Sequence, residues 1–122
     1  LDDILEQLDA VPNAAAPVET TRLEVAEADG AELRVLDKLT GAVTDLSLRP
    51  GEVAELGFLS VSLVACRYPV ENPSGDAFSY IEVLDRKDNV DLFAGWLLAS
   101  APALNAMDHP RYDVWALRCI TS

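Results

Sequence analysis

The sequence predicts an all-β, mainly antiparallel domain, folded as a β-sandwich or a small barrel. Two observations favour this class. From residue 21 onward, apolar and polar residues alternate in several short stretches, which is the period of half-buried strands. Clusters of Gly, Pro, Asn and Asp separate these stretches and predict turns. Many short strands joined by turns are typical of sandwiches and small barrels.

The expected strands follow one another with few residues between them. Leu33 and Val35 alternate with polar neighbours, and Gly41 can adopt the left-handed conformation that closes a hairpin after them. Pro50 and Gly51 predict the next turn. In order, the strands are expected in ELRVLD, AVTDLSL, FLSVSLVAC, AFSYIEVLD, VDLFAGWLL and YDVWALRCI.

One short helix is expected inside the domain, near residues 101–108. Ser100 can cap its start, Pro102 suits its first turn, and Leu104 and Met107 would face inward.

Residues 1–20 differ from the rest and are expected to form a separate segment, with a single β domain over 21–122. The first ten residues predict a possible acidic amphipathic helix, and a Pro/Ala linker follows them. A helix of ten residues is marginal alone in water. We therefore expect its apolar stripe to dock on the domain or on a partner, with fraying as the other outcome; the stripe is Leu1, Ile4, Leu5 and Leu8.

The charge and length of the chain exclude some classes of partner. Its 122 residues fit one domain, and 9 basic against 21 acidic residues give a formal net charge of -12. The basic residues are scattered, so we expect no nucleic-acid binding and little attraction to anionic lipid. No apolar run is long enough to span a bilayer. A chain that starts at Leu1 is expected to have lost an N-terminal piece, either a secretory signal or a tag.

The two cysteines, Cys66 and Cys119, lie in separate apolar stretches. Their spacing suits neither zinc nor thioredoxin-type chemistry. From the residues alone, one bridge in an oxidising compartment and two buried thiols in a cytosolic core both stay open.

The only histidine, His109, is the main candidate for catalytic chemistry. A Ser–His–Asp triad would need Asp108 or Asp113 as its acid, but no serine lies in a nucleophile elbow. One histidine and two distant cysteines make a weak metal site. We therefore expect no catalytic residue, no metal site and no cofactor.

A structural role explains the same stretch, MDHPRYDVW, at least as well. Pro110 pushes His109 into an extended conformation, and neighbouring polar side chains can then bond backbone groups at the corner that leads into the last strand. Tyr112 and Trp115 would face opposite sides of that strand. We expect a structural corner or a partner contact at Asp108, His109, Pro110, Tyr112, Asp113 and Trp115.

Two stretches resemble the signature blocks of domain-of-unknown-function family 2155, small exported proteins of alphaproteobacteria. They are LRVLDKLTG (33–41) and FAGWLLASAPALNAMDHPRYDVWALRC (93–119). The first block matches at Asp37, Lys38, Thr40 and Gly41. The second matches at Gly95, Trp96, Ser100, Pro102, Leu104, His109, Pro110, Tyr112, Asp113, Trp115 and Cys119. Ala101 and Asp108 are mild departures from serine and glutamate.

The resemblance implies a periplasmic protein with its signal peptide removed and a disulfide between Cys66 and Cys119. It brings no established activity, but genes of the family often lie near one for a small accessory subunit of respiratory complex I (NADH:quinone oxidoreductase). We therefore expect a non-catalytic accessory or interaction subunit on the periplasmic side of an inner-membrane complex. The alternatives are a small-ligand or glycan-binding module with a groove lined by Tyr80 and Tyr112, and a hydrolase that uses His109.

Overall fold

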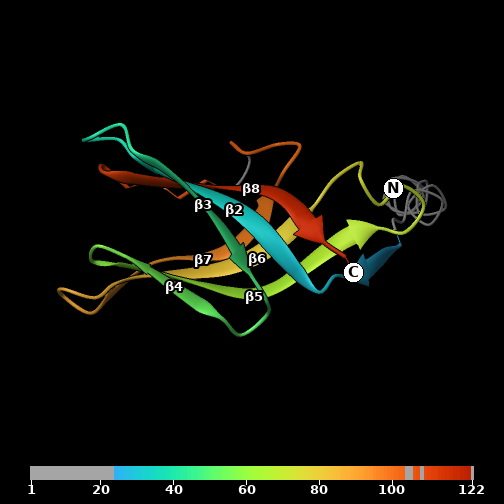
Figure 1. The fold of residues 1–122 in the computed structure, drawn as a ribbon, viewed down its shortest axis with the longest axis horizontal. Coiled ribbons are helices and arrows are strands. Elements are labelled where there is room, and N and C mark those ends of the chain that lie inside the picture. Colours follow the sequence, from blue (N-terminus) through green and yellow to red (C-terminus); the bar gives the residue numbers. More distant parts are fainter. Residues whose placement is uncertain (1–23, 104–105, 108, 122) are drawn as a thin grey trace, which may run out of the picture.

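The computed structural model describes residues 24–103, 106, 107 and 109–121 (Figure 1). This part of the chain contains strands and no helix, and all paired strands are antiparallel, which confirms the expected all-β class. The strands are β1 (Val25–Glu27), β2 (Gly30–Asp37), β3 (Val43–Leu48), β4 (Val53–Leu56), β5 (Leu59–Pro69), β6 (Phe78–Asp85), β7 (Val90–Leu98) and β8 (Tyr112–Ile120).

The strands form two layers, which fits the sandwich rather than the barrel. A three-stranded sheet has the order β3-β2-β8. The five-stranded sheet has the order β1-β5-β6-β7, and one edge of β5 pairs with β4 at its start and with β1 at its end. Across the layers, β2 contacts β5, and β8 contacts β6 and β7. Figure 1 shows the small sheet above the large one.

The core lies between the sheets and follows from the alternation of side chains along each strand. In β2, Leu33 and Val35 are buried, while the residues that alternate with them are partly exposed. Burial of each such side chain stabilises the fold by roughly 1.5–3 kcal/mol. The largest fully buried side chains are Leu33, Leu59, Leu63, Ile81, Leu97, Val61, Val83, Val114, Cys66 and Ser79.

Two β-bulges turn both cysteines toward the core. The pairing of β5 with β6 steps from Leu63 to Ala65, and the pairing of β8 with β2 steps from Ala116 to Arg118. Each step inserts one extra residue, so the alternation of the strand shifts by one position. Without these bulges, an odd spacing from Leu63 and from Ala116 would turn Cys66 and Cys119 to the outer faces.

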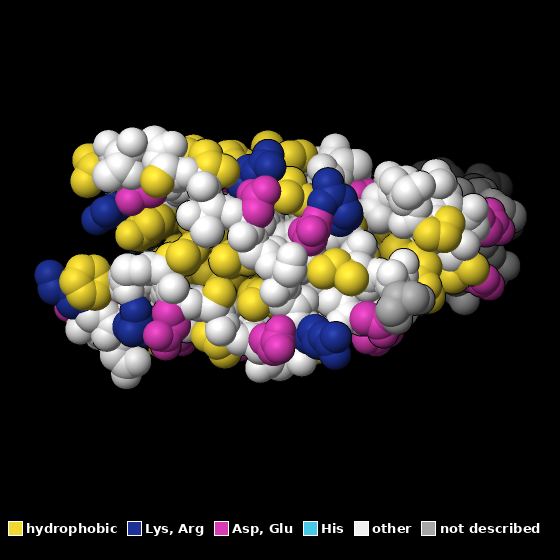
Figure 2. Space-filling view, in the orientation of Figure 1, with side chains coloured by type: hydrophobic (Ala, Val, Ile, Leu, Met, Phe, Trp, Pro, Cys, Tyr) yellow, Lys and Arg dark blue, Asp and Glu magenta, His cyan; other side chains and the backbone are white. Residues whose placement is uncertain are grey.

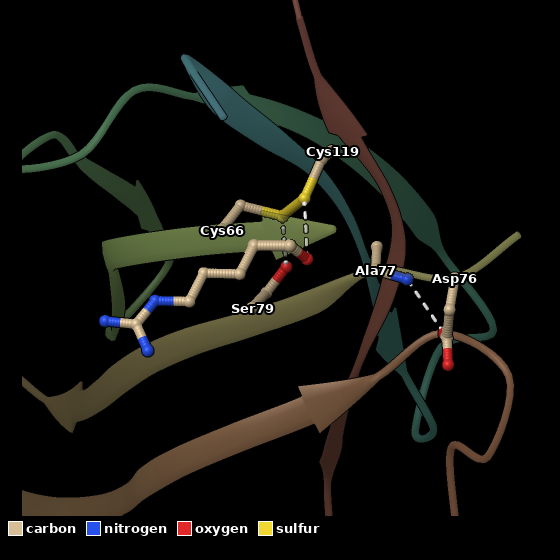
Figure 3. The surroundings of a disulfide bond; sticks show 6 residues. Cys66, Asp76, Ala77, Ser79 and Cys119 are labelled. Atoms are coloured by element: carbon tan, nitrogen blue, oxygen red, sulfur yellow. Dashed lines mark hydrogen bonds between the residues drawn. A yellow bond between two sulfur atoms is a disulfide. The ribbon is translucent and has the colours of Figure 1, made fainter. Parts of the chain in front are cut away.

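Cys66 of β5 and Cys119 of β8 are joined across the two layers (Figure 3), with an S–S distance of 2.08 Å and a Cα–Cα distance of 5.8 Å. This pairing is the one that the family resemblance implied. The hydroxyl of Ser79 lies 3.2 Å from the Cys66 sulfur and donates to it, because a disulfide sulfur carries no hydrogen. The Cys119 sulfur lies 3.3 Å from the carbonyl oxygen of Arg67.

The helix expected near residues 101–108 is wrong: no helix is present among the residues described between β7 and β8. Ser100 does not cap a helix; its hydroxyl donates to Asp76 Oδ2 at 2.7 Å. Met107 is buried at 3% exposure without helical structure. A helix of eight residues, with Pro102 in its first turn and Pro110 just beyond its end, gains too few hydrogen bonds to offset its nucleation, so side-chain burial decides the path of the loop.

Some expectations fall outside the described residues. The segment 1–20 with its stripe of Leu1, Ile4, Leu5 and Leu8 is one, and Asp108 is another. Within the described residues, no helix has the length and apolar character needed to cross a membrane.

Candidate functional site

The candidate site lies at one end of the sandwich, where the turn after β2 meets the chain that enters β8. The pairing of these strands ends with Asp37 opposite Tyr112. Beyond it, the Lys38 amide donates to the Arg111 carbonyl at 2.6 Å, and Lys38 Nζ donates to the His109 carbonyl, also at 2.6 Å. The two stretches that carry the family resemblance are therefore in direct contact, and we call this region the signature end.

An ion pair between Asp37 and Arg111 fixes the signature end. Arg111 Nη2 lies 2.9 Å from Asp37 Oδ2, and Arg111 Nε lies 3.1 Å from Oδ1, which is a two-point contact. The hydrogen-bonded guanidinium lowers the pKa of Asp37 from 3.8 to about 2; burial opposes this shift, and the amides of Leu39 and Thr40 add to it. The same pairing raises the pKa of Arg111.

Asp37 also shapes the turn that follows it. Its Oδ1 accepts the amide of Leu39 at 3.0 Å, and its carbonyl accepts the amide of Gly41 at 2.7 Å. Gly41 has a φ of 81°, the left-handed conformation expected from the sequence. The carboxylate is thus fully engaged by the turn and by Arg111. The turn presents Leu39 outward, with 75% of its surface exposed.

His109 is half-buried, and its ring bonds the backbone of the chain that enters β8. Nδ1 lies 3.0 Å from the amide nitrogen of Arg111 and 3.2 Å from that of Tyr112, and it accepts from both. An accepting Nδ1 places the ring hydrogen on Nε2. The His109 and Tyr112 rings are 5.7 Å apart. These contacts have the form expected of a structural corner, and that role stays a prediction.

The other residues expected at this corner divide between two faces. Tyr112 is on the same face of β8 as the buried residues Val114 and Ala116, which is the face toward the core. Trp115 is on the outer face, where it pairs with Arg34. The Asp113 carboxylate accepts the amide of Val114 at 3.0 Å. Pro110 is exposed.

A cavity of about 210 Å³ opens between the two sheets at the signature end. Figure 2 shows the molecule hollowed between its layers at the left end. Apolar walls and a few polar groups, among them Asp37 and Arg111, give the cavity the mixed character of a small-ligand pocket. Its lining residues are Val35, Asp37, Ala42, Thr44, Leu56, Gly57, Arg111 and Tyr112.

A groove lined by both Tyr80 and Tyr112 is not formed. Tyr80 lies on the outer face of the five-stranded sheet, where its ring packs edge-on against Trp96 at 5.2 Å. Tyr112 lies in the other sheet, on the cavity between the layers. The sequence shows that each residue belongs to a strand, but pairing between strands decides which face and which layer each one joins.

Sequence reasoning missed Arg111 as the residue that connects the two signature blocks. An arginine and an aspartate 74 residues apart give no local signal of pairing. Within the described residues, His, Cys, Asp and Glu form no group of three or more that could hold a metal ion.

Comparison with known proteins gives one relative and one family. An uncharacterized protein of Rickettsia prowazekii (strain Madrid E), RP359, is 26% identical over 87 residues, which is 69% of this chain and 56% of the relative. The chain therefore spans little more than half of that relative. No solved structure matches this chain. Residues 31–119 match the model of the family described as "Uncharacterized protein conserved in bacteria (DUF2155)". The chain belongs to this family.

Proposed function

We propose that this protein is a non-catalytic interaction domain, an accessory subunit on the periplasmic side of an inner-membrane assembly. One observation carries the proposal. Part of each signature stretch, residues 37–41 of the first and 109–112 of the second, meets at one end of the sandwich, where their polar groups bond one another and the backbone. An end whose turns are held by such bonds and carry exposed side chains suits recognition of another molecule.

The polar side chains at the signature end already accept hydrogen bonds from the protein itself, which argues against catalysis. A general base needs a free lone pair near a nucleophile. Here His109 Nδ1 accepts two backbone amides, and Asp37 accepts from Arg111 and from its own turn. This supports the non-catalytic function over a hydrolase that uses His109.

The turns at the signature end carry side chains that suit a protein contact. Leu39 is 75% exposed, and Phe58, in the turn between β4 and β5, is 55% exposed. Lys87 Nζ lies 5.5 Å from the centre of the Phe58 ring. Aromatic side chains such as Phe58 are enriched at the centres of protein interfaces, and charged side chains such as Lys87 lie at their rims, so a partner could bury the apolar groups between such charges.

Respiratory complex I is the named candidate partner, and its support is the gene context of the resembled family. The disulfide supports an oxidising compartment such as the periplasm. The test is to express the tagged full chain in its native host, solubilise the membranes in mild detergent, and identify co-purified complexes by mass spectrometry. Absence of the chain from every membrane complex would overturn the proposal.

A matched pair of variants places the contact on the molecule. Leu39→Glu adds a charge at the signature end, and Val70→Glu adds the same charge to a residue that is 46% exposed, in the loop after β5 at the opposite end. We expect Leu39→Glu to lower co-purification at least tenfold and Val70→Glu to leave it unchanged. Equal losses would move the contact away from the signature end.

A small-ligand or glycan-binding module is the second candidate, supported by the cavity of about 210 Å³ between the sheets. Its polar wall holds Arg111 and Tyr112, which could orient a ligand. Titration with periplasmic glycans, followed by NMR, would report binding as shifts at Gly57 and Thr44. Shifts confined to other regions would remove this candidate.

A further inference from the structure

A second surface, far from the signature end, carries an aromatic cluster. It lies on the outer face of the five-stranded sheet, near the C-terminal ends of β5 and β7, at the end of the sheet where β1 pairs with β5. We call it the tryptophan face; it consists of Val25, Arg67, Phe78, Tyr80, Trp96 and Leu98.

The strand register places these side chains in adjacent rows of one face. Arg67 pairs with Phe78, and Phe78 pairs with Leu98 in the next strand. Tyr80 pairs with Trp96 in the neighbouring row. Arg67 Cζ lies 5.1 Å from the centre of the Trp96 ring. The outer face of an antiparallel sheet in a sandwich is normally polar, so this concentration of large apolar side chains points to a covering group.

The face is shaped to receive such a group. A shallow depression of about 240 Å³ is lined by apolar residues and Arg67. The Nε of Arg67 is buried and has no hydrogen-bond partner among the described residues. Its Nη2 lies 3.4 Å from Glu27, whose side chain is 66% exposed. A buried guanidinium N–H is normally satisfied, so the face offers one donor to an acceptor that the described chain does not supply.

The chain itself supplies a segment with the matching chemistry at this place. Val25, the first residue of β1, lines the depression, so the preceding residues are attached at its rim. Those residues include the apolar stripe expected from the sequence. They also carry acidic side chains that complement Arg67; these are Asp2, Asp3, Glu6, Asp9 and Glu19.

We propose that residues 1–10 bind the tryptophan face of the same molecule. The apolar stripe covers Phe78, Trp96 and Leu98, and one carboxylate of the segment accepts the Nε hydrogen of Arg67. The proposal goes beyond the function proposed above, because it uses a different surface and needs no second molecule. It also chooses between the two docking places that the sequence left open for the stripe, the domain and a partner.

The tether makes even a weak contact effective. About 15 residues separate the stripe from β1, and a flexible chain of that length spans roughly 20 Å, which keeps the segment within reach of the face. Tethering at this range gives an effective concentration on the order of millimolar. A segment with sub-millimolar intrinsic affinity would therefore occupy the face most of the time.

The test uses the full chain with Trp115→Phe, so that tryptophan fluorescence reports Trp96 alone. The stripe variant, Ile4→Asp with Leu5→Asp, is compared with Gln7→Asp plus Ala10→Asp, which adds the same charge off the stripe. We expect the acrylamide quenching constant of Trp96 to rise at least about twofold in the stripe variant, with a red shift of emission. The control should keep the parent value.

Other occupants give different results. Quenching that is equal in the parent and in the stripe variant would overturn the proposal. If a second copy covers the face, quenching will change with protein concentration and the stripe variant will sediment as a smaller species; that result would also overturn it. If a carboxylate of the segment pairs with Arg67, added salt should increase the quenching of Trp96 in the parent protein. Arg67→Met should also increase this quenching, and salt should then have no further effect on it. Since all these measurements use one purified chain, their failure leaves the proposed function untouched.

Discussion

Removal of the bridge between Cys66 and Cys119 is expected to cost a large share of the stability of the domain. The two cysteines are 53 residues apart, and closure of a loop of this length restricts the unfolded chain by about 4 kcal/mol in the chain-entropy account. Domains are usually stable by about 5–15 kcal/mol, so the reduced protein should be marginal. One contact offsets a small part of the loss: a reduced Cys119 thiol could donate to the Arg67 carbonyl, 3.3 Å away.

The assay is urea unfolding of three samples: the oxidised protein, the same protein reduced, and Cys66→Ala with Cys119→Ala. Reduction keeps both sulfur atoms in place, so the first difference measures the bridge alone. The double variant also loses packing around Cys66, which is fully buried, and should be less stable than the reduced protein by about 1 kcal/mol. Fluorescence and far-UV circular dichroism should give coincident transitions if unfolding is two-state.

A loss below about 1 kcal/mol on reduction would refute this reasoning. It would mean either that residual structure already holds the two strands together in the unfolded ensemble, or that the bridge strains the native state. A double variant as stable as the oxidised protein would refute both the entropy argument and the packing argument.

Three further predictions concern the signature end. Asp37 has a pKa of about 2, below its usual 3.8, so its contribution to stability is complete above about pH 4 and lost as the pH falls through 2; urea midpoints of Asp37→Asn should lack this acid dependence. His109→Ala should lower the free energy of unfolding by about 1–3 kcal/mol, because the amides of Arg111 and Tyr112 lose their acceptor, and His109→Asn, whose Oδ1 can replace Nδ1, should recover part of it; equal losses would contradict the corner role. Gly41→Ala should cost about 1 kcal/mol in thermal unfolding, since alanine is strained at a φ of 81°, and an unchanged melting temperature would contradict this.

Local pattern was enough to predict six of the eight strands and most of their turns, but the two shortest strands, β1 and β4, were not predicted. Leu33 and Val35 in β2, and Leu59, Val61 and Leu63 in β5, alternate as expected and are buried. Turn residues marked the hairpin ends correctly because their backbone preferences are local. The order of strands in the sheets could not be predicted, since it depends on which faces bury each other across long separations.

Bulges are the clearest limit of the period-two pattern. Counted by alternation alone, Cys66 would face away from the side that buries Leu63, and Cys119 away from Ala116. The extra residues at Val64 and Leu117 reverse both orientations. Neither residue is a glycine or a proline, so the sequence carries no local sign of the bulge.

The sequence identified most residues of the candidate site, but it did not show that they lie together in the structure. His109 and its neighbours were identified from their rarity and clustering, and Asp37 and Lys38 through the family resemblance. Their contact depends on the antiparallel pairing of β2 with β8, which brings chain positions more than 70 residues apart together. Arg111 carries no signal of its own until that pairing is known.

The position of the disulfide has a mechanical consequence. It fastens the two layers near the ends of β5 and β8, whereas the cavity between the layers opens at their other ends. The bridge limits separation of the sheets most strongly near the sulfur atoms, so we expect the two sheets to move apart most easily at the signature end, while the Asp37–Arg111 ion pair holds β2 and β8 together within one sheet. A partner that separates the turns there would meet less resistance than one that acts at the bridged end, and hydrogen exchange should show Thr44 and Leu56 opening before Ser79.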